Sequence, residues 1–128
     1  MKKVLVFGSF DRLHKGHLDF FRQARKHGDK LIAVVARDMT IKNLKGKKPK
    51  QKEKTRLRNV AEHVDKALLG NKTNKYAVIK RIKPDVICLG YDQNSFTKDL
   101  RKHFKKKIIR LKPYKPHKYK SSKLTTKR

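Results

Sequence analysis

Two histidines, His14 and His17, are the residues of this sequence whose types and spacing point most directly to chemistry. They lie in the segment GSFDRLHKGH, residues 8–17, between a short apolar run and a helical pattern. Gly8 is expected to let the chain turn sharply, and Gly16 to let a phosphate approach the backbone N–H groups at the helix start. Two imidazoles there can donate hydrogen bonds to a phosphorus centre that gathers negative charge during in-line displacement. The segment predicts a site for phosphate chemistry; the alternative is that both histidines are only exposed or capping groups.

The elements that must position this segment alternate between strands and helices. Continuous apolar runs predict strands at residues 3–7, 31–36, 64–69, 86–89 and 107–111. Apolar residues at helical spacing predict helices at residues 17–27, 53–63, 71–82 and 94–104, and the first of these should turn Leu18, Phe21 and Ala24 inward. This alternation predicts an α/β fold, a Rossmann-like, doubly wound and mainly parallel five-stranded sheet with helices on both faces. In such a sheet, ligands bind where the chain leaves the carboxyl ends of the strands, as residues 8–17 do.

Two lysine-rich segments, residues 39–52 and 112–128, fit neither pattern and are predicted to be loops that hold a ligand. We expect residues 1–111 to form one α/β domain and residues 112–128 to form a basic C-terminal segment. Between residues 101 and 128 there are thirteen Lys and Arg and no carboxylate, so we expect this end to be mobile unless an anion orders it.

Charge and cysteine content narrow the classes of partner and compartment. The 128 residues carry 38 Lys and Arg against 10 Asp and Glu, a formal net charge of +28, so nucleic acids or nucleotides are the expected partners. Cys88 is the only cysteine and lies in an apolar run, which predicts a buried thiol and a cytoplasmic protein. The longest purely apolar run, residues 31–36, is far shorter than the roughly 20 residues that span a membrane. No histidine or cysteine cluster has zinc-like spacing, so no metal-ligating residue is predicted.

The pattern GSFDxxHxGH of residues 8–17 resembles the motif of the cytidylyltransferase-like nucleotidyltransferase superfamily. Within that superfamily, the segments ARD (36–38), DKA (65–67), LGYDQ (89–93) and YKSSK (119–123) together resemble the archaeal FAD synthases most closely. The resemblance implies a nucleotidyltransferase that moves an adenylyl group from ATP to FMN, giving FAD and pyrophosphate. One alternative is a cytidylyltransferase acting on glycerol 3-phosphate or a similar small phosphorylated acceptor, although residues 115–118 lack the Arg-Thr pair of those enzymes. An alternative of another class is a basic nucleic-acid-binding protein on the same fold.

The resemblance also implies roles for individual residues. Catalytic roles are implied for His14, His17 and Lys45, the last in a segment, residues 42–48, that resembles the family's mobile lysine loop. Nucleotide binding is implied for a larger set: Gly8, Ser9, Phe10, His14, Lys15, Gly16, His17, Gly90, Asp92, Tyr119, Ser121 and Ser122. Residues 112–128 would then complete the nucleotide site.

Acceptor binding is expected of Asp11 and Arg56. The alternatives are that Asp11 orients the loop or caps local backbone groups, and that Arg56 pairs with Glu53 along a helix. A divalent cation, Mg²⁺, is expected to arrive with the triphosphate, since it keeps several waters and needs few protein ligands. A homodimer is expected because related small cytidylyltransferases form homodimers.

Overall fold

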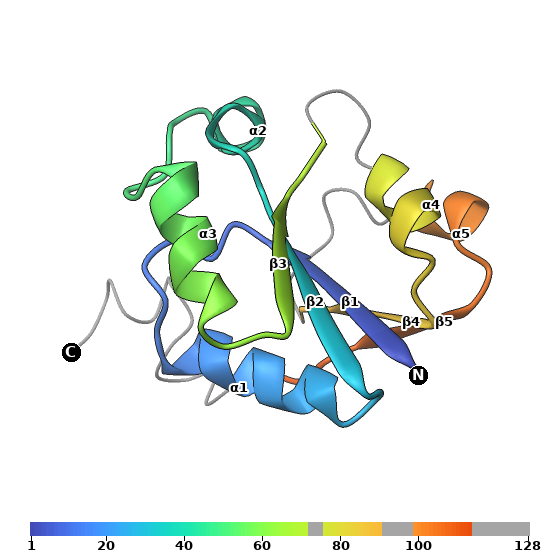
Figure 1. Ribbon diagram of the computed structural model, residues 1–128. Coiled ribbons are helices and arrows are strands. Elements are labelled where there is room, and N and C mark those ends of the chain that lie inside the picture. Colours follow the sequence, from blue (N-terminus) through green and yellow to red (C-terminus); the bar gives the residue numbers. More distant parts are fainter. Residues whose placement is uncertain (72–75, 91–98, 114–128) are drawn as a thin grey trace.

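A five-stranded, wholly parallel sheet forms the centre of the molecule (Figure 1). The computed structural model describes residues 1–71, 76–90 and 99–113. The strands are β1 (Lys3–Gly8), β2 (Lys30–Val35), β3 (Lys66–Leu69), β4 (Val86–Leu89) and β5 (Lys107–Arg110). Their order is β3-β2-β1-β4-β5, so the chain winds outward in one direction from β1 and then returns to wind outward in the other. The switch point of this doubly wound sheet lies between β1 and β4, and the first βα loop leaves the sheet beside it.

The apolar runs form strands because both faces of the sheet are covered. Val4, Leu5 and Val6 of β1 are fully buried, since β1 pairs with β2 on one side and with β4 on the other. Val4 and Val6 belong to the core on one face, whereas Leu5 belongs to the core on the opposite face. This alternation is the two-residue period of a strand, applied to a strand buried on both sides.

Helices cover both faces of the sheet, as the sequence predicted (Figure 1). Helices α1 (Lys15–Arg25) and α3 (Glu53–Ala61) lie on one face, while α4 (Ala77–Ile82) and α5 (Leu100–His103) lie on the other. Helix α2 (Asp38–Lys45) follows β2 directly and stands beyond the carboxyl end of that strand. None of the helices within the described ranges is long and apolar enough to cross a membrane.

Two details of the sequence prediction are wrong. Residues 39–52 were expected to be a loop, but the first part of this segment belongs to α2, which buries Ile41 and ends at Gly46 in the left-handed conformation, with φ 82°. Leu18 was expected to face inward but is 40% exposed, because α1 turns Phe21, Ala24 and the polar Asp19 toward the rest of the molecule. Helix α2 was not predicted because a short amphipathic helix with one buried residue leaves little periodic signal among so many lysines.

Candidate functional site

The loop between β1 and α1 is held by a phenylalanine that folds back onto the strand end. Phe10 has a positive φ of 51° and is only 3% exposed. A Cβ on Gly8 would lie 2.8 Å from Cζ of the Phe10 ring, so Gly8 is required by this packing. The φ of Gly8 is not in the left-handed region, and the turn is made instead by Phe10 and by Arg12, with φ 57°.

Phe10 was expected to bind the nucleotide, and the structure corrects this. Its ring packs in the core against Phe20 and Phe21, with centroids 6.2 and 5.2 Å away. The ring also makes an edge contact with His17, at a centroid distance of 5.8 Å. Phe10 therefore supports the imidazole of His17 from the core side, and its ring is buried in the core.

His14 and His17 cap the start of α1. Nδ1 of His14 accepts a hydrogen bond from the Gly16 N–H at 3.0 Å, and Nδ1 of His17 accepts one from the His14 N–H at 3.2 Å. The two ring centroids are 4.0 Å apart, with the rings inclined by 33°. Because Nδ1 of each neutral ring is an acceptor, its proton resides on Nε2, on the edge of the ring away from the helix backbone. The arrangement offers two imidazole N–H donors side by side at the positive end of a helix dipole.

Both imidazoles are held in the neutral form at physiological pH. Burial and, to a smaller extent, the nearby His14 lower the pKa of His17 to about 4, although the carboxylate of Asp11 acts in the opposite direction. Burial also lowers the pKa of His14. In the neutral form each ring keeps Nδ1 as the acceptor of its backbone hydrogen bond and Nε2–H as a donor to an anion.

The absence of a side chain at Gly16 leaves room for the ring of His14. A Cβ at this position would lie 2.8 Å from Cε1 and 3.0 Å from Nδ1 of His14, so any side chain would displace the ring. The N–H of Gly16 itself donates to Nδ1 of His14, so this backbone group belongs to the cap. The HxGH spacing is therefore a requirement of the cap geometry.

Asp11 ties this loop to the segment before α3. Its Oδ2 accepts a hydrogen bond from the Lys50 N–H at 2.7 Å, and its Oδ1 accepts one from the Gln51 N–H at 2.9 Å. A third hydrogen bond connects the same two segments: Oε1 of Gln51 accepts from the Arg12 N–H at 2.9 Å. Asp11 thus uses both oxygens on backbone N–H groups nearly forty residues away, which favours the loop-orienting role over capping of local groups.

Arg56 is the centre of the network at the carboxyl edge of the sheet. Its side chain is fully buried, and its guanidinium donates to four protein oxygens. The acceptors are the carbonyls of Gln51 (2.9 Å), Ser9 (2.8 Å) and Ala36 (2.7 Å) and the Asp38 carboxylate (2.7 Å). It therefore joins the ends of β1 and β2 to the starts of α2 and α3.

Both sequence-based expectations for Arg56 are wrong. A fully buried guanidinium committed to four protein acceptors cannot reach an acceptor phosphate. Nor does it pair with Glu53, whose Oε1 accepts a hydrogen bond from the Asp38 N–H at 2.8 Å and whose Oε2 lies 3.5 Å from Nη1 of Arg37. Glu53 thereby caps the start of α2, and Asp38, Gln51 and Glu53 are positioning residues that the sequence reasoning missed. A carboxylate in the first turn of each helix was the available signal.

The remaining predicted residues are distributed along the same edge or lie outside the described residues. Ser9 and Gly90 follow β1 and β4, and the exposed Lys15 is the first residue of α1. Lys45 is the exposed last residue of α2, seven positions after Asp38 and therefore two turns farther along the same face of the helix. Asp92, Tyr119, Ser121 and Ser122 lie outside the described residues.

Two further predictions concern the cysteine and the absence of metal-ligating residues. Cys88 of β4 is fully buried, as predicted, and burial raises the pKa of its thiol to about 11. Within residues 1–71, 76–90 and 99–113, no group of three or more His, Cys, Asp or Glu side chains could hold a metal ion. The described residues thus offer no resident metal centre beside the histidine pair.

Comparison with known proteins settles the family. The profile of the family described as Cytidylyltransferase-like matches residues 5–126, which includes all of the described sheet except the first two residues of β1. The chain belongs to the cytidylyltransferase-like family. The doubly wound sheet and the HxGH turn are therefore the family's fold and motif, and the resemblance seen in the sequence is confirmed.

Relatives within the cytidylyltransferase-like family include archaeal proteins named FAD synthase. The chain is 43% identical over 121 residues to the FAD synthase of Aciduliprofundum boonei, which covers 89% of this chain and 80% of the relative. It is 40% identical over 120 residues to the FAD synthase of Methanohalobium evestigatum, covering 87% and 77% of the two chains. A crystal structure described as the lipopolysaccharide core biosynthesis protein of Thermoplasma volcanium matches with a TM-score of 0.83 and 38% identity, over 89% of this chain and 98% of that one.

Proposed function

We propose that this chain is an FMN adenylyltransferase, which forms FAD and pyrophosphate from FMN and MgATP. The observation that carries the proposal is the pair of neutral, Nδ1-capped imidazoles at the start of α1, beside the switch point of the sheet. Membership of the cytidylyltransferase-like family supports nucleotidyl transfer, and the FAD synthase names of relatives at 40–43% identity support this pair of substrates.

The reaction is an in-line displacement at the α-phosphorus of ATP. A phosphate oxygen of FMN forms a bond to that phosphorus, the bond to the bridging oxygen breaks, and pyrophosphate leaves with the electron pair. Nε2–H groups of His14 and His17 donate to the phosphate oxygens on which charge grows, and the helix dipole acts in the same direction. Since their neutral forms are maintained by burial, these donors are already in place before charge develops.

Further contacts to the nucleotide are assigned to other residues that the family resemblance implies. Ser121 and Ser122 bind the distal phosphates, while Asp92 and Tyr119 bind the ribose or base, together with the backbone at Gly90. Lys45 reaches the reacting phosphates from the end of α2. Lys45 lies one turn after the buried Ile41 and near it round the helix, whereas Lys42, the residue after Ile41, points in another direction, which favours Lys45.

Magnesium enters as part of the substrate. The triphosphate oxygens and water supply most of its ligands, since Mg²⁺ needs few from the protein. We also place the enzyme in the cytoplasm, where its single buried thiol stays reduced.

The experiment that tests this function is a substrate screen with pyrophosphate release as the readout. ATP and CTP are each offered with FMN and with glycerol 3-phosphate. Turnover of the ATP–FMN pair and of no other pair supports the proposal, whereas turnover of CTP with glycerol 3-phosphate favours a cytidylyltransferase. Nucleic-acid binding, suggested by the net charge of +28, is tested by the salt dependence of affinity for a duplex. The homodimer stays a prediction, which sedimentation at several protein concentrations tests.

A further inference from the structure

Helices α4 and α5 and the turns that follow them carry many basic side chains and few carboxylates. Residues 80–85 and 99–107 contain eight Lys and Arg, all of them exposed, against two carboxylates, Asp85 and Asp99. Both carboxylates already have basic partners, since Asp85 lies 3.7 Å from Nζ of Lys106 and Asp99 lies 3.5 Å from Nζ of Lys102. This region, which we call the α4–α5 basic surface, therefore keeps most of its positive charge uncompensated.

The two segments form one surface because the elements that carry them pack together. Helices α4 and α5 lie side by side on the same face of the sheet (Figure 1). Val78 of α4 belongs to the same apolar core as Leu100 and Phe104. The strands that follow the helices are also neighbours, with Val86 of β4 opposite Lys107 of β5. Basic residues about twenty positions apart in sequence are thus presented to the same partner.

An aromatic ring lies within the α4–α5 basic surface. The imidazole of His103 stacks on the ring of Tyr76, with the centroids 3.9 Å apart and the planes inclined by 14°. Tyr76 is buried, at 8% exposure, whereas His103 is exposed. Since Tyr76 covers one face of the imidazole, the opposite face and the ring edges meet solvent. Lys80 lies one helical turn after Tyr76, on the same side of α4. The surface therefore combines a supported flat ring with nearby cations.

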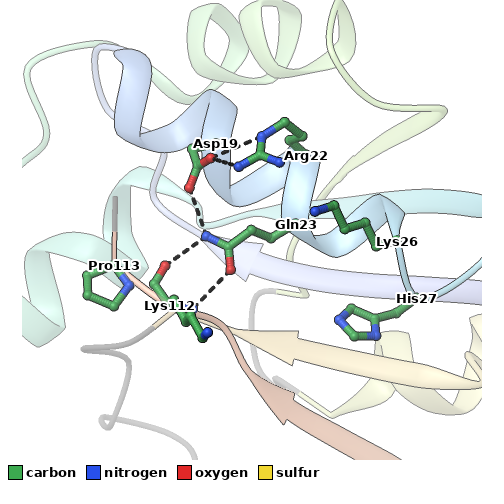
Figure 2. Close-up of a pocket in the computed structure, with 7 residues that line it drawn as sticks. All are labelled: Asp19, Arg22, Gln23, Lys26, His27, Lys112 and Pro113. Atoms are coloured by element: carbon green, nitrogen blue, oxygen red, sulfur yellow. Dashed lines mark hydrogen bonds and ion pairs between the residues drawn. The ribbon is translucent and has the colours of Figure 1, made fainter. Parts of the chain in front are cut away.

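The basic residues of α1 are arranged differently (Figure 2). Arg22 donates to the buried carboxylate of Asp19, and the Gln23 amide exchanges hydrogen bonds of 3.0 and 2.8 Å with the backbone of Lys112. Lys26 lines a cavity of about 460 Å³ beside these groups. The polar groups there attach the chain after β5 to α1, so we regard the α4–α5 basic surface as the better candidate for an outside partner.

We propose that the α4–α5 basic surface binds a single-stranded nucleic acid, with a base stacked on His103 and the surrounding Lys and Arg side chains bound to its phosphates. Charge complementarity selects a polyanion. The exposed ring face selects one with unpaired bases, because the faces of bases in a duplex are covered by their neighbours.

This surface is separate from the site of nucleotidyl transfer. Helices α4 and α5 cover the face of the sheet opposite to α1, whose start carries His14 and His17. A nucleic acid bound there leaves the histidine pair accessible to its substrates. The proposal therefore does not depend on the proposed function, and either can fail without the other.

The test measures the affinity of the full chain for a short fluorescent oligouridylate by anisotropy over a range of salt concentrations. Oligothymidylate of the same length, a duplex of the same length and phosphatidylserine vesicles are the comparison probes. The charge variant is Lys80→Gln/Arg81→Gln/Lys105→Gln, whose three side chains take part in no ion pair within residues 76–90 and 99–113. Its control removes as many exposed charges from α3 and the end of α1: Lys26→Gln/Lys54→Gln/Arg58→Gln.

The charge variant should bind oligouridylate at least about 10-fold more weakly than the wild type at roughly 0.1 M salt. The slope of log Kd against log salt concentration should fall by about 2, since each phosphate contact on a single strand contributes about 0.7. The control should lose less than about 3-fold, because long-range attraction between exposed charges is largely screened at this salt concentration. Both proteins should keep the melting temperature of the wild type.

Substitutions at His103 test the stacking. His103→Ala should weaken oligouridylate binding about 10-fold with little change in the salt slope, and His103→Phe, which keeps a flat ring, should stay within about 2-fold of the wild type. Tighter binding of oligouridylate than of oligothymidylate identifies the ligand as RNA, and the reverse identifies it as single-stranded DNA; each result supports the proposal.

Three results would overturn the proposal. Equal losses in the charge variant and its control would show that net charge alone attracts the probe. Wild-type affinity in a folded His103→Ala protein would exclude a stacked base. Tighter binding to the duplex or to the vesicles than to either single strand would assign the surface to another polyanion. FAD formation is measured with the same proteins, and its absence from the wild type would count against the proposed function only.

Discussion

The imidazoles of His14 and His17 lie with their centroids 4.0 Å apart, and Nδ1 of each accepts a hydrogen bond from a backbone N–H of the same helix start. The caps hold each neutral ring by Nδ1 and leave its proton on Nε2. Capping and phosphate binding were alternatives at the level of sequence, yet here one arrangement performs the first and prepares the second. The two roles can be separated by substitution.

Replacing His14 by Asn should preserve the cap and remove the donor. Asn is among the best N-cap residues, so its Oδ1 replaces Nδ1 and the free energy of unfolding should fall by less than about 0.5 kcal/mol. No N–H remains at the place of Nε2, so kcat for FAD formation should fall about 100-fold to 1000-fold. Denaturant unfolding and a steady-state assay measure the two effects.

His14→Ala is the matched comparison, because it loses the cap as well. Its free energy of unfolding should fall by about 1 kcal/mol more than that of His14→Asn, with a similar loss of kcat. A folded His14→Asn protein with wild-type kcat is incompatible with a catalytic donor at this position.

Stability should depend on pH through His17. The folded-state pKa, about 4, lies below the ordinary value of 6.5, so the folded protein disfavours the proton relative to the unfolded chain. This contribution to stability is fully present above pH 6.5 and is lost as pH falls toward 4. Between pH 7 and 4.5 the loss should be on the order of 2–3 kcal/mol.

Acidic and other histidine groups titrate in the same range, so the His17 contribution is obtained by difference. His17→Asn keeps an acceptor for the His14 N–H but does not titrate, and its unfolding free energy should fall less between the two pH values. Parallel pH curves for the two proteins would show that the pKa of His17 is not lowered by folding.

Gly16→Ala should reduce activity through His14. The added Cβ would lie 2.8 Å from Cε1 of the His14 ring, so the ring must move, whereas Ala is a better helix former than Gly. We expect kcat to fall at least about 10-fold, as for a misplaced donor, with little change in stability. Gly70→Ala is the control, since its Cβ would meet Val34 at 3.6 Å, an ordinary contact. Equal kcat in both variants would refute the requirement for glycine.

Arg56→Met should destabilise the fold rather than weaken FMN binding selectively. It leaves three carbonyls and the Asp38 carboxylate without their buried donor, which should lower the unfolding free energy by about 3 kcal/mol. Arg58→Met, at an exposed position of α3, should have a small effect. If the Arg56→Met protein had a normal melting temperature and a raised KM for FMN, Arg56 would instead be assigned to acceptor binding.

The sheet was predictable because its strands are buried on both faces and therefore read as continuous apolar runs. The β4 prediction matches Val86–Leu89 to the residue, and the other strands differ by one or two residues at an end. Helix α2 was missed because Ile41 is its only buried residue, and its start is capped from outside by Glu53. A contact between residues fifteen positions apart leaves no periodic pattern.

The histidine pair was predictable for a similar reason: its spacing, glycines and flanking elements are all local. The roles of Asp11, Arg56 and Phe10 depended instead on partners distant in sequence. Asp11 binds the segment before α3, Arg56 binds the ends of two strands, and Phe10 enters the core. Residue type and spacing identified these positions as important, but they could not distinguish a residue that supports the structure of the site from one that binds the ligand.

The central claim, adenylyl transfer at the His14–His17 pair, is tested most directly by product formation from FMN and MgATP. The wild-type chain should form FAD and pyrophosphate in equal amounts, and a folded His14→Asn/His17→Asn protein should lose at least about 100-fold in kcat while its melting curve stays cooperative. No FAD from the wild-type chain, or wild-type turnover by the folded double variant, would contradict the account.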